Sequence, residues 1–168
     1  MRLTNVVLIA ALFAAVGVPL AAFGGNAAAA DHSPVINVPS SDPEMAAAIA
    51  KARATLPAFW ASYDNPKPPE TGHSLKVRFP TGGNNAEHIW MAEVKKLGNG
   101  LCSGRFANSP RDLPGKREGD LVEFREADIS DWMFMRNGKI VGGETLRPLL
   151  KSMPKADAAA LRARMETP

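Results

Sequence analysis

Cysteine, histidine and tyrosine are scarce in this sequence, and their scarcity excludes several kinds of chemistry. The 168 residues include one cysteine, three histidines and one tyrosine. A single cysteine forms no disulfide within the chain, so the domain depends on its hydrophobic core for stability. His32, His73 and His88 lack the spacing of metal ligands. We therefore expect neither a metal site nor a cofactor.

Excess charge of one sign is also lacking. The chain has 20 basic and 17 acidic side chains, a formal net charge of +3. A nucleic-acid-binding surface needs a clustered basic face, which such a small excess does not indicate. Beyond the first thirty residues, no apolar run is long enough to cross a bilayer. We expect no nucleic-acid partner and no stable membrane insertion of the mature chain.

The first thirty residues have the pattern of an export signal. Arg2 is their only charged residue, residues 6–23 form an apolar run, and residues 24–30 are mostly small. This order, with Ala28 and Ala30 at the small positions before the cleavage point, is typical of a cleavable signal peptide. An uncleaved membrane anchor is the alternative. We expect cleavage after Ala30 and a mature protein that is periplasmic or secreted.

The remainder of the chain is long enough for one domain. About 138 residues follow the predicted cleavage point, which allows a single modest core. Residues 31–40 contain two prolines and are expected to form a flexible leader. Residues 41–152 are expected to form a single α+β domain. Residues 153–168 are expected to form a polar, alanine-rich helical tail that lies loosely on the surface.

A helix is predicted at the start of the domain. Ser41 and Glu44 have the spacing of a capping box, and residues 45–54 strongly favour helix. Pro57 is expected to end this helix and begin a second helical stretch over residues 58–63. The apolar side chains that share one stripe of the first helix, and should face the core, are Met45, Ile49, Ala52 and Leu56.

From about residue 73 to residue 143 the apolar side chains alternate as they do in strands. The predicted strands cover residues 75–79, 87–97, 101–108, 121–126, 131–136 and 139–142, followed by a short helix over residues 145–152. We expect an α+β fold with the N-terminal helix packed on a small, twisted antiparallel β-sheet. The sheet could curl into a partly closed, SH3-like barrel.

Two turns set the register of this sheet. A three-residue loop over residues 98–100 is favoured over a two-residue Asn99-Gly100 turn, because it pairs Ala92 with Phe106 and places Trp90 with Cys102 on one apolar face. Cys102 is then a buried structural thiol. The second hairpin is predicted to turn on Asn137-Gly138 and to pair Phe134 with Val141.

Several landmarks of the sequence resemble a known family. They are Leu75-Lys76-Val77, Glu87-His88-Ile89-Trp90, Gly119-Asp120-Leu121-Val122, Ile129-Ser130-Asp131-Trp132, Gly138-Lys139 and residues 142–147. In identity and order they resemble the YegJ-like family of bacterial proteins, a domain of unknown function. The resemblance covers residues 42–150 and leaves out residues 155–168. It implies no catalytic residue and no substrate.

The candidate catalytic residues are Glu87, His88 and Asp131. Glu87 and His88 are neighbours in a strand and point to opposite faces, so His88 needs a partner from elsewhere, such as Asp128 or Asp131. A polar pair that caps the sheet is the simpler interpretation. Ser130 suggests a nucleophile beside His88, but no G-x-S-x-G elbow surrounds it, which favours a hydrogen-bonded bend before the strand.

The candidate binding residues are aromatic or basic. Trp60 and Tyr63 lie near a proline-rich loop and could form an exposed patch, whereas Trp132 shares a face with Phe134 and is expected mainly in the core. Arg111 and Arg117 lie in a mixed-charge loop that could contact a partner.

Two functions from different classes are compatible with these residues. The favoured hypothesis is a small binding or interaction module of the cell envelope, with a periplasmic or envelope protein as its partner. The alternative is a small hydrolase or lyase that uses His88 with Asp131 or Glu87. A domain that only stabilises a larger assembly is a third possibility.

Overall fold

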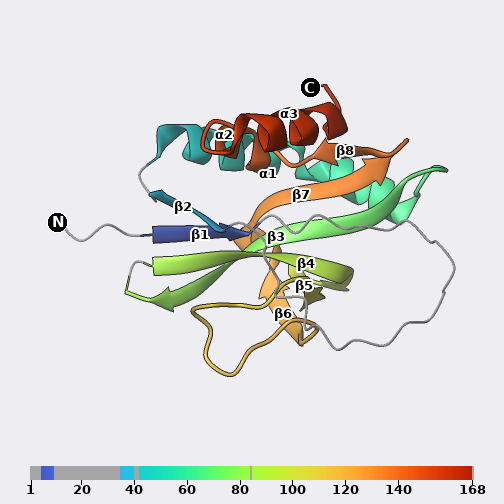
Figure 1. Ribbon diagram of the computed structural model, residues 1–168. Helices are drawn as coiled ribbons and strands as arrows, with labels where there is room; N and C mark the ends of the chain where they lie inside the picture. The colour runs from blue at the N-terminus through green and yellow to red at the C-terminus, as the bar shows by residue number, and fades with distance from the viewer. Residues whose placement is uncertain (1–4, 10–34, 40–41, 84, 168) are drawn as a thin grey trace, which may run out of the picture.

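The longest element of the fold is helix α1, Pro43–Asp64 (Figure 1). The computed structural model of the protein describes residues 5–9, 35–39, 42–83 and 85–167. Asp42 caps α1, because its carboxylate accepts the backbone N–H groups of Glu44 and Met45. The cap is therefore Asp42 and not the predicted Ser41, which lies outside the described residues.

Helix α1 continues through Pro57, so the predicted break there is wrong. Proline lacks the N–H that would donate to the preceding turn, which normally weakens a helix. Here the flanking side chains Leu56, Phe59 and Trp60 are 8%, 0% and 9% exposed, so their burial holds the two halves of α1 on the sheet. The predicted apolar stripe is confirmed, with Met45, Ala52 and Leu56 buried and Ile49 partly buried.

Six antiparallel strands form the sheet on which α1 packs. They are β3 (Thr71–Gly82), β4 (Asn85–Gly98), β5 (Leu101–Phe106), β6 (Leu121–Arg125), β7 (Ile129–Arg136) and β8 (Lys139–Gly142). Their order across the sheet is β6-β5-β4-β3-β7-β8. The predicted α+β class is confirmed, and the sheet is curved but not closed into a barrel.

Two further strands extend the sheet beside β4. Strand β1, Asn5–Ile9, runs parallel to β4, and β2, Val35–Pro39, pairs antiparallel with β1. Strand β1 lies within the predicted signal peptide and β2 within the predicted leader, while residues 10–34 lie outside the described residues. Cleavage after Ala30 stays a prediction, and it would remove β1 from the sheet.

The turn between β4 and β5 differs from the predicted one. Gly98 pairs with Leu101, so the chain reverses over Asn99-Gly100 and the predicted three-residue loop is wrong. Asn99 has φ 52° and Gly100 has φ 71°, the left-handed conformations that such a short hairpin turn requires.

A bulge in β4 changes which side chains share a face. Glu93 has φ 49°, and the β4–β5 register shifts beside it. As a result Met91 pairs with Phe106, in place of the predicted Ala92. Met91 and Phe106 lie in the core under α1, whereas Trp90 lies on the other face of the sheet. The prediction that Trp90 shares the face of Cys102 is therefore wrong.

The β7–β8 hairpin follows its prediction. Asn137 and Gly138 form the turn, and Phe134 pairs with Val141. Gly142 has φ 80°, and a Cβ at this position would clash with the carbonyl oxygen and the indole ring of Trp132. Glycine is required there because it allows β8 to approach β7 closely.

The two faces of the sheet are covered by different parts of the chain. Helix α1 covers one face, and α2 (Leu146–Leu149) and α3 (Lys155–Arg164) pack on the other, near β7 and β8 (Figure 1). Ala158 and Leu161 of α3 are 7% and 5% exposed. The tail is helical as predicted, but it belongs to the core instead of lying loosely on the surface. No helix within the described ranges is long and apolar enough to span a membrane.

Candidate functional site

Lys76 of β3 is the centre of a buried polar network. It is 0% exposed and lies between Trp90 of β4 and Asp131 of β7 in the sheet. Its Nζ donates to Thr145 Oγ1 at 3.1 Å and lies 5.0 Å from the centroid of the Trp90 ring. Burial lowers the pKa of Lys76 to about 7, and the nearby Asp131 carboxylate opposes this shift only in part. The middle of β3 is thus buried on both faces of the sheet.

Asp131 collects four hydrogen bonds in this network. Its carboxylate accepts the backbone N–H groups of Trp132, Glu144 and Thr145 at 2.8, 3.2 and 2.8 Å, and the Thr145 hydroxyl at 2.6 Å. Burial raises the pKa of Asp131, while Lys76 and the hydrogen bonds from Thr145 and Trp132 act in the opposite direction. The carboxylate therefore ties the segment before α2 to the middle of the sheet.

A β-bulge explains why two neighbouring residues of β7 share a face. Lys76 pairs with Asp131 and Val77 pairs with Ile129, so Ser130 is an extra residue in β7. Ile129 and Trp132 pack in the core under α1, while Ser130 and Asp131 both reach the polar network. Strict alternation along the sequence gives no signal for this arrangement.

His88 contacts the bulge residue rather than a carboxylate. Its Nδ1 lies 2.8 Å from Ser130 Oγ, and Ser130 Oγ donates to the Lys76 carbonyl at 3.2 Å. A hydroxyl has one hydrogen, so when Ser130 donates it to the Lys76 carbonyl, Nδ1–H of His88 donates to Ser130. Burial and the charges of Lys76, Arg78 and Arg53 lower the pKa of His88 to about 3. The imidazole is neutral, and in this tautomer Nδ1 carries a hydrogen and has no lone pair with which to activate Ser130 as a base.

Glu87 lies on the face of β4 opposite to His88, as the sequence predicts. Its buried carboxylate accepts the backbone N–H groups of Arg111 and Asp112 at 3.0–3.1 Å. Glu87 therefore anchors the loop between β5 and β6. Within the described residues, no direct hydrogen bond joins His88 to Glu87 or to Asp131.

The three aromatic binding candidates are built into the core. Trp60 and Trp132 are 9% and 5% exposed, and the Trp60 indole N–H donates to Glu126 Oε1 at 3.3 Å. Tyr63 packs against the core, and its hydroxyl donates to a backbone carbonyl of β4 at 2.8 Å. The expected exposed patch at Trp60 and Tyr63 is therefore absent from the described surface.

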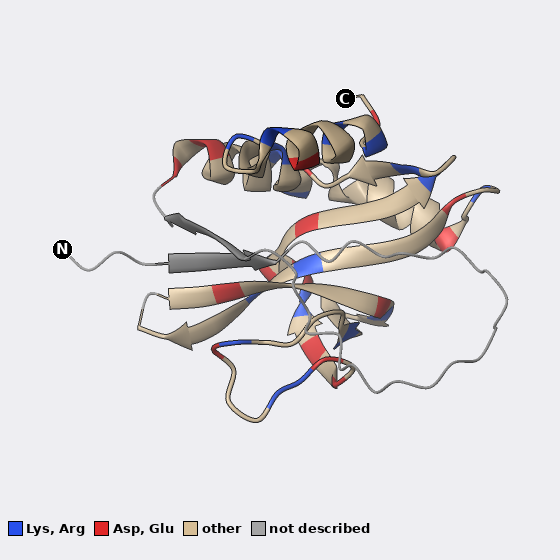
Figure 2. Ribbon diagram, in the orientation of Figure 1, with Lys and Arg blue, Asp and Glu red and all other residues tan. Residues whose placement is uncertain are grey.

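The two basic binding candidates lie on the surface of the β5–β6 loop. Arg111 and Arg117 are exposed, and the Arg117 side chain lies 3.6 Å from Asp120. Figure 2 shows that this loop carries both signs of charge. Its mixed composition matches the sequence prediction.

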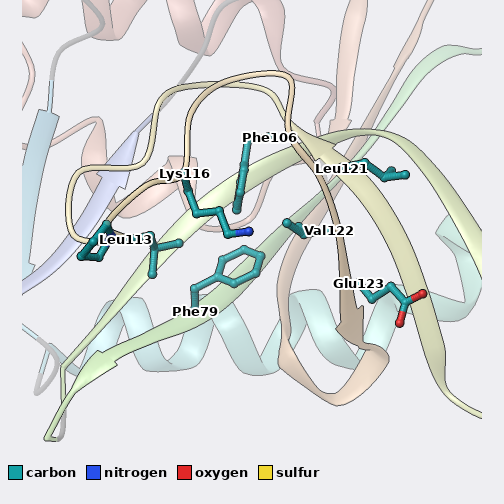
Figure 3. Close-up of a pocket in the computed structure, with 8 residues that line it drawn as sticks. Phe79, Phe106, Leu113, Lys116, Leu121, Val122 and Glu123 are labelled. Carbon is teal, nitrogen blue, oxygen red and sulfur yellow. The ribbon is translucent and has the colours of Figure 1, made fainter.

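An open apolar groove lies under this loop (Figure 3). It has a volume of about 530 Å³. The rings of Phe79 and Phe106 pack edge to face in its floor, with their centroids 5.2 Å apart. Leu121 lies at the side of the groove, and its side chain is 59% exposed. The lining residues are Phe79, Phe106, Leu113, Pro114, Lys116, Leu121, Val122 and Glu123, to which we refer as the β6 groove.

Sequence reasoning missed the β6 groove, although one signal was present. In β6, Val122 and Phe124 alternate as inward-facing residues, so Leu121 is an apolar residue on the outward face. A large exposed hydrophobic residue beside a cavity is a common feature of interaction surfaces. Leu113 lies in a loop that is otherwise charged and gave a second, weaker signal.

A second cluster was also missed, where α1 ends beside β3. Ser62 Oγ donates to Glu70 Oε2 at 2.8 Å, and His73 Nε2 lies 2.8 Å from the same hydroxyl. The hydrogen bond from Ser62, together with the Lys67 backbone N–H and Arg136, lowers the pKa of Glu70 to about 2. The serine lies between the acid and the histidine, which is not the order of a nucleophile, base and acid relay.

The fold and these features define a small α+β domain with a sealed polar network and an open apolar groove. The chain belongs to a family described as uncharacterized proteins conserved in bacteria (DUF2314), which matches residues 42–165. This confirms the resemblance to the YegJ-like family and extends it past residue 150 into α3.

Two curated relatives share parts of the sequence. The uncharacterized protein YegJ of Escherichia coli K12 is 37% identical over 93 residues, which are 55% of this chain and 60% of that protein. A putative ankyrin repeat protein of Neisseria meningitidis serogroup B is 31% identical over 86 residues, or 49% of this chain and 34% of that protein. The chain thus spans less than two thirds of each relative. No solved structure matches it.

Proposed function

We propose that this protein is an exported interaction module of the bacterial cell envelope that binds a partner protein in the β6 groove. The observation that carries the proposal is an open apolar cavity of about 530 Å³ beside a leucine that is 59% exposed. Removing apolar surface from water is favourable, so a partner that fills the groove gains part of its affinity there. The N-terminal sequence supports the proposed export.

The position of the exposed leucine matters for this proposal. Leu97 and Leu121 are the two exposed large hydrophobic side chains among the described residues, at 48% and 59%. Leu97 lies beside the β4–β5 turn, away from the residues that line the groove, whereas Leu121 lines it. Isolated exposed leucines are common, but an apolar residue that continues into a cavity favours a binding surface.

A hydrolase or lyase that uses His88 is the second candidate. The 2.8 Å contact between His88 and Ser130 is the observation in its favour. The polar groups concerned are enclosed, since Ser130 and Asp131 are 0% exposed and His88 is 6% exposed. Their hydrogen bonds are directed at one another and at the backbone, so the arrangement favours a structural role for the network.

Site-specific photocrosslinking tests the proposed function. A photoreactive amino acid replaces Leu121 in the full chain, produced in its own bacterium, and replaces Leu97 in a matched control. We expect a discrete crosslinked partner from position 121 and none from position 97. Equal products at both positions, or none at either, would contradict a partner in the β6 groove. N-terminal sequencing of the periplasmic protein should give Asp31 as the first residue.

A further inference from the structure

One edge of β6 borders the groove, and its hydrogen bonds can be assigned. The backbone N–H of Glu126 donates to the Gly100 carbonyl at 2.8 Å, and the N–H of Phe106 donates to the Asp120 carbonyl at 3.1 Å. In an antiparallel pair, the residues that exchange hydrogen bonds with the neighbouring strand alternate with residues that do not. The even-numbered residues of β6 therefore direct their backbone groups toward β5.

The odd-numbered residues of β6 direct their backbone N–H and C=O groups away from β5. The N–H and C=O groups of Leu121, Glu123 and Arg125 point to the other side of β6, where no described residue pairs with the strand. Backbone groups at such an edge are a template for one more strand. We infer that the β6 groove receives an extended polypeptide segment of the partner, which adds to β6 as a further strand. This inference rests on the proposed function and specifies how the groove binds.

The end of β3 forms the opposite wall of the same space. The pairing of β3 with β7 ends at Val77, so β3 continues from Arg78 with β4 on one side and no described strand on the other. A second cavity of about 340 Å³ shares Phe79 and Glu123 with the groove and extends to Arg125. Together the two cavities occupy the gap between β6 and the end of β3.

The floor of the gap fits the side chains of an extended segment. Successive side chains of a strand point to opposite faces, so every second side chain of an added strand faces the floor. Phe79, Phe106 and Val122 form that floor, and Leu113 of the overlying loop adds a fourth apolar side chain. The segment is therefore expected to carry apolar residues at alternate positions.

The charges around the gap suggest an acidic residue in the partner. The two cavities are lined by three basic side chains, Arg78, Lys116 and Arg125, and by two acidic ones, Glu123 and Asp128. None of the five forms an ion pair with another described residue. The Lys116 ammonium points toward Phe79 and Val122, over the floor of the groove (Figure 3). An acidic side chain of the added strand can pair with it.

The unpaired backbone groups of β6 favour a polypeptide as the ligand, in preference to a lipid chain or a small apolar molecule. A lipid chain or a small apolar molecule could cover the phenyl rings of the floor. It would leave the N–H and C=O groups of Leu121, Glu123 and Arg125 to water, whereas an extended peptide bonds to them directly. Hydrogen bonding to this edge is therefore the property that the experiment must detect.

Peptide selection followed by backbone substitution tests the inference. A phage-displayed library of random dodecapeptides is selected against the full chain, and the most enriched peptide is synthesised with a fluorescent label. We expect enrichment of sequences with alternating apolar residues and an acidic residue. Absence of any enriched sequence would overturn the inference. Binding of the peptide is then measured by fluorescence anisotropy.

Two variants at one position separate hydrogen bonding from charge. Glu123→Pro removes an outward N–H without removing a bond to β5, and Glu123→Thr keeps that N–H while removing the same charge. We expect Glu123→Pro to raise the dissociation constant of the peptide at least tenfold and Glu123→Thr to change it less than threefold. Equal weakening by both variants would contradict strand addition. The urea midpoint of each variant establishes that it is folded.

A change in the peptide keeps the inference testable if Glu123→Pro does not fold. N-methylation of alternate peptide amides removes donors on one edge of the added strand. Two peptides are compared, one methylated at the odd-numbered amides and one at the even-numbered amides. We expect one of them to have a dissociation constant at least tenfold higher than the unmethylated peptide, and the other to differ from it less than threefold. If neither parity matters but Leu121→Lys abolishes binding, the groove binds side chains and the proposed function stands without strand addition. If Leu121→Lys also has no effect, both proposals fail.

Discussion

The polar network and the β6 groove reverse the usual distribution of polarity in opposite ways. The network encloses Lys76 and Asp131 at 0% exposure, whereas the groove leaves Leu121 at 59% exposure. In Figure 1 the α2 and α3 segment that covers the network and the loop over the groove lie at opposite ends of the molecule. Buried charge must be satisfied by partners within the protein, while exposed apolar surface can be satisfied by a partner outside it.

This contrast indicates different roles for the polar network and the β6 groove. The hydrogen bonds of Asp131 hold the start of α2 on the sheet, so the network is expected to determine stability. The groove makes no such connection through Leu121, so it is expected to determine binding. Substitutions that separate stability from binding therefore test the comparison directly.

The largest effect is expected from Asp131→Ala. This change leaves Lys76 buried without its carboxylate and leaves three backbone N–H groups without an acceptor. Breaking a buried charge network of this kind costs about 3–5 kcal/mol. Urea denaturation should show this loss in the free energy of unfolding, and Asp131→Asn, which keeps one oxygen, should lose less. An unchanged urea midpoint for Asp131→Ala would contradict a stabilising network.

A smaller effect is expected from the titration of Lys76. The pKa of Lys76 is lowered from 10.5 to about 7 in the folded protein, so between these values the unfolded chain binds more protons. Stability therefore rises with pH in this window, by about 2 kcal/mol between pH 7 and pH 9. The Lys76→Met variant should lack this rise when unfolding by urea is measured at both pH values. Parallel pH profiles for the two proteins would show that folding does not lower the pKa of Lys76.

His88 should contribute on the acid side, and by less. Its pKa falls from 6.5 to about 3 on folding, so in this window the unfolded chain again binds more protons. Stability decreases as the pH falls, by about 1 kcal/mol between pH 6 and pH 5. His88→Gln should be less sensitive to acid over the same interval. Equal acid sensitivity of both proteins would argue against a buried, neutral imidazole.

Local turn chemistry explains which parts of the fold the sequence could predict. The β7–β8 hairpin was predicted with its pairing, because Asn137-Gly138 suits a two-residue turn and the flanking residues are in phase. The β4–β5 register could not be predicted, since it depends on a bulge at Glu93. Glutamate rarely adopts a positive φ, and nothing in the residue pattern marks that position.

The same physics limited prediction of the candidate sites. His88, Ser130 and Asp131 were singled out, but an extra residue in β7 decides that Ser130 and Asp131 share a face. Lys76 alternates with apolar residues and therefore has the pattern of a solvent-facing side chain, although α2 and α3 cover it. These burials arise from segments distant in sequence, which alternation within one strand does not report.

The smallest effect on stability is expected at the groove. A substitution there should change binding and leave stability unaltered, in contrast to a substitution in the polar network. Leu121 is mostly exposed, so Leu121→Lys should change the free energy of unfolding by less than about 0.5 kcal/mol. Leu97→Lys makes the same chemical change at a site of similar exposure and should be equally neutral. Calorimetry of both variants checks this, and crosslinking or peptide binding should be lost only for Leu121→Lys. A large loss of stability in that variant would place Leu121 in the core, and the groove would then have a structural role like that of the network.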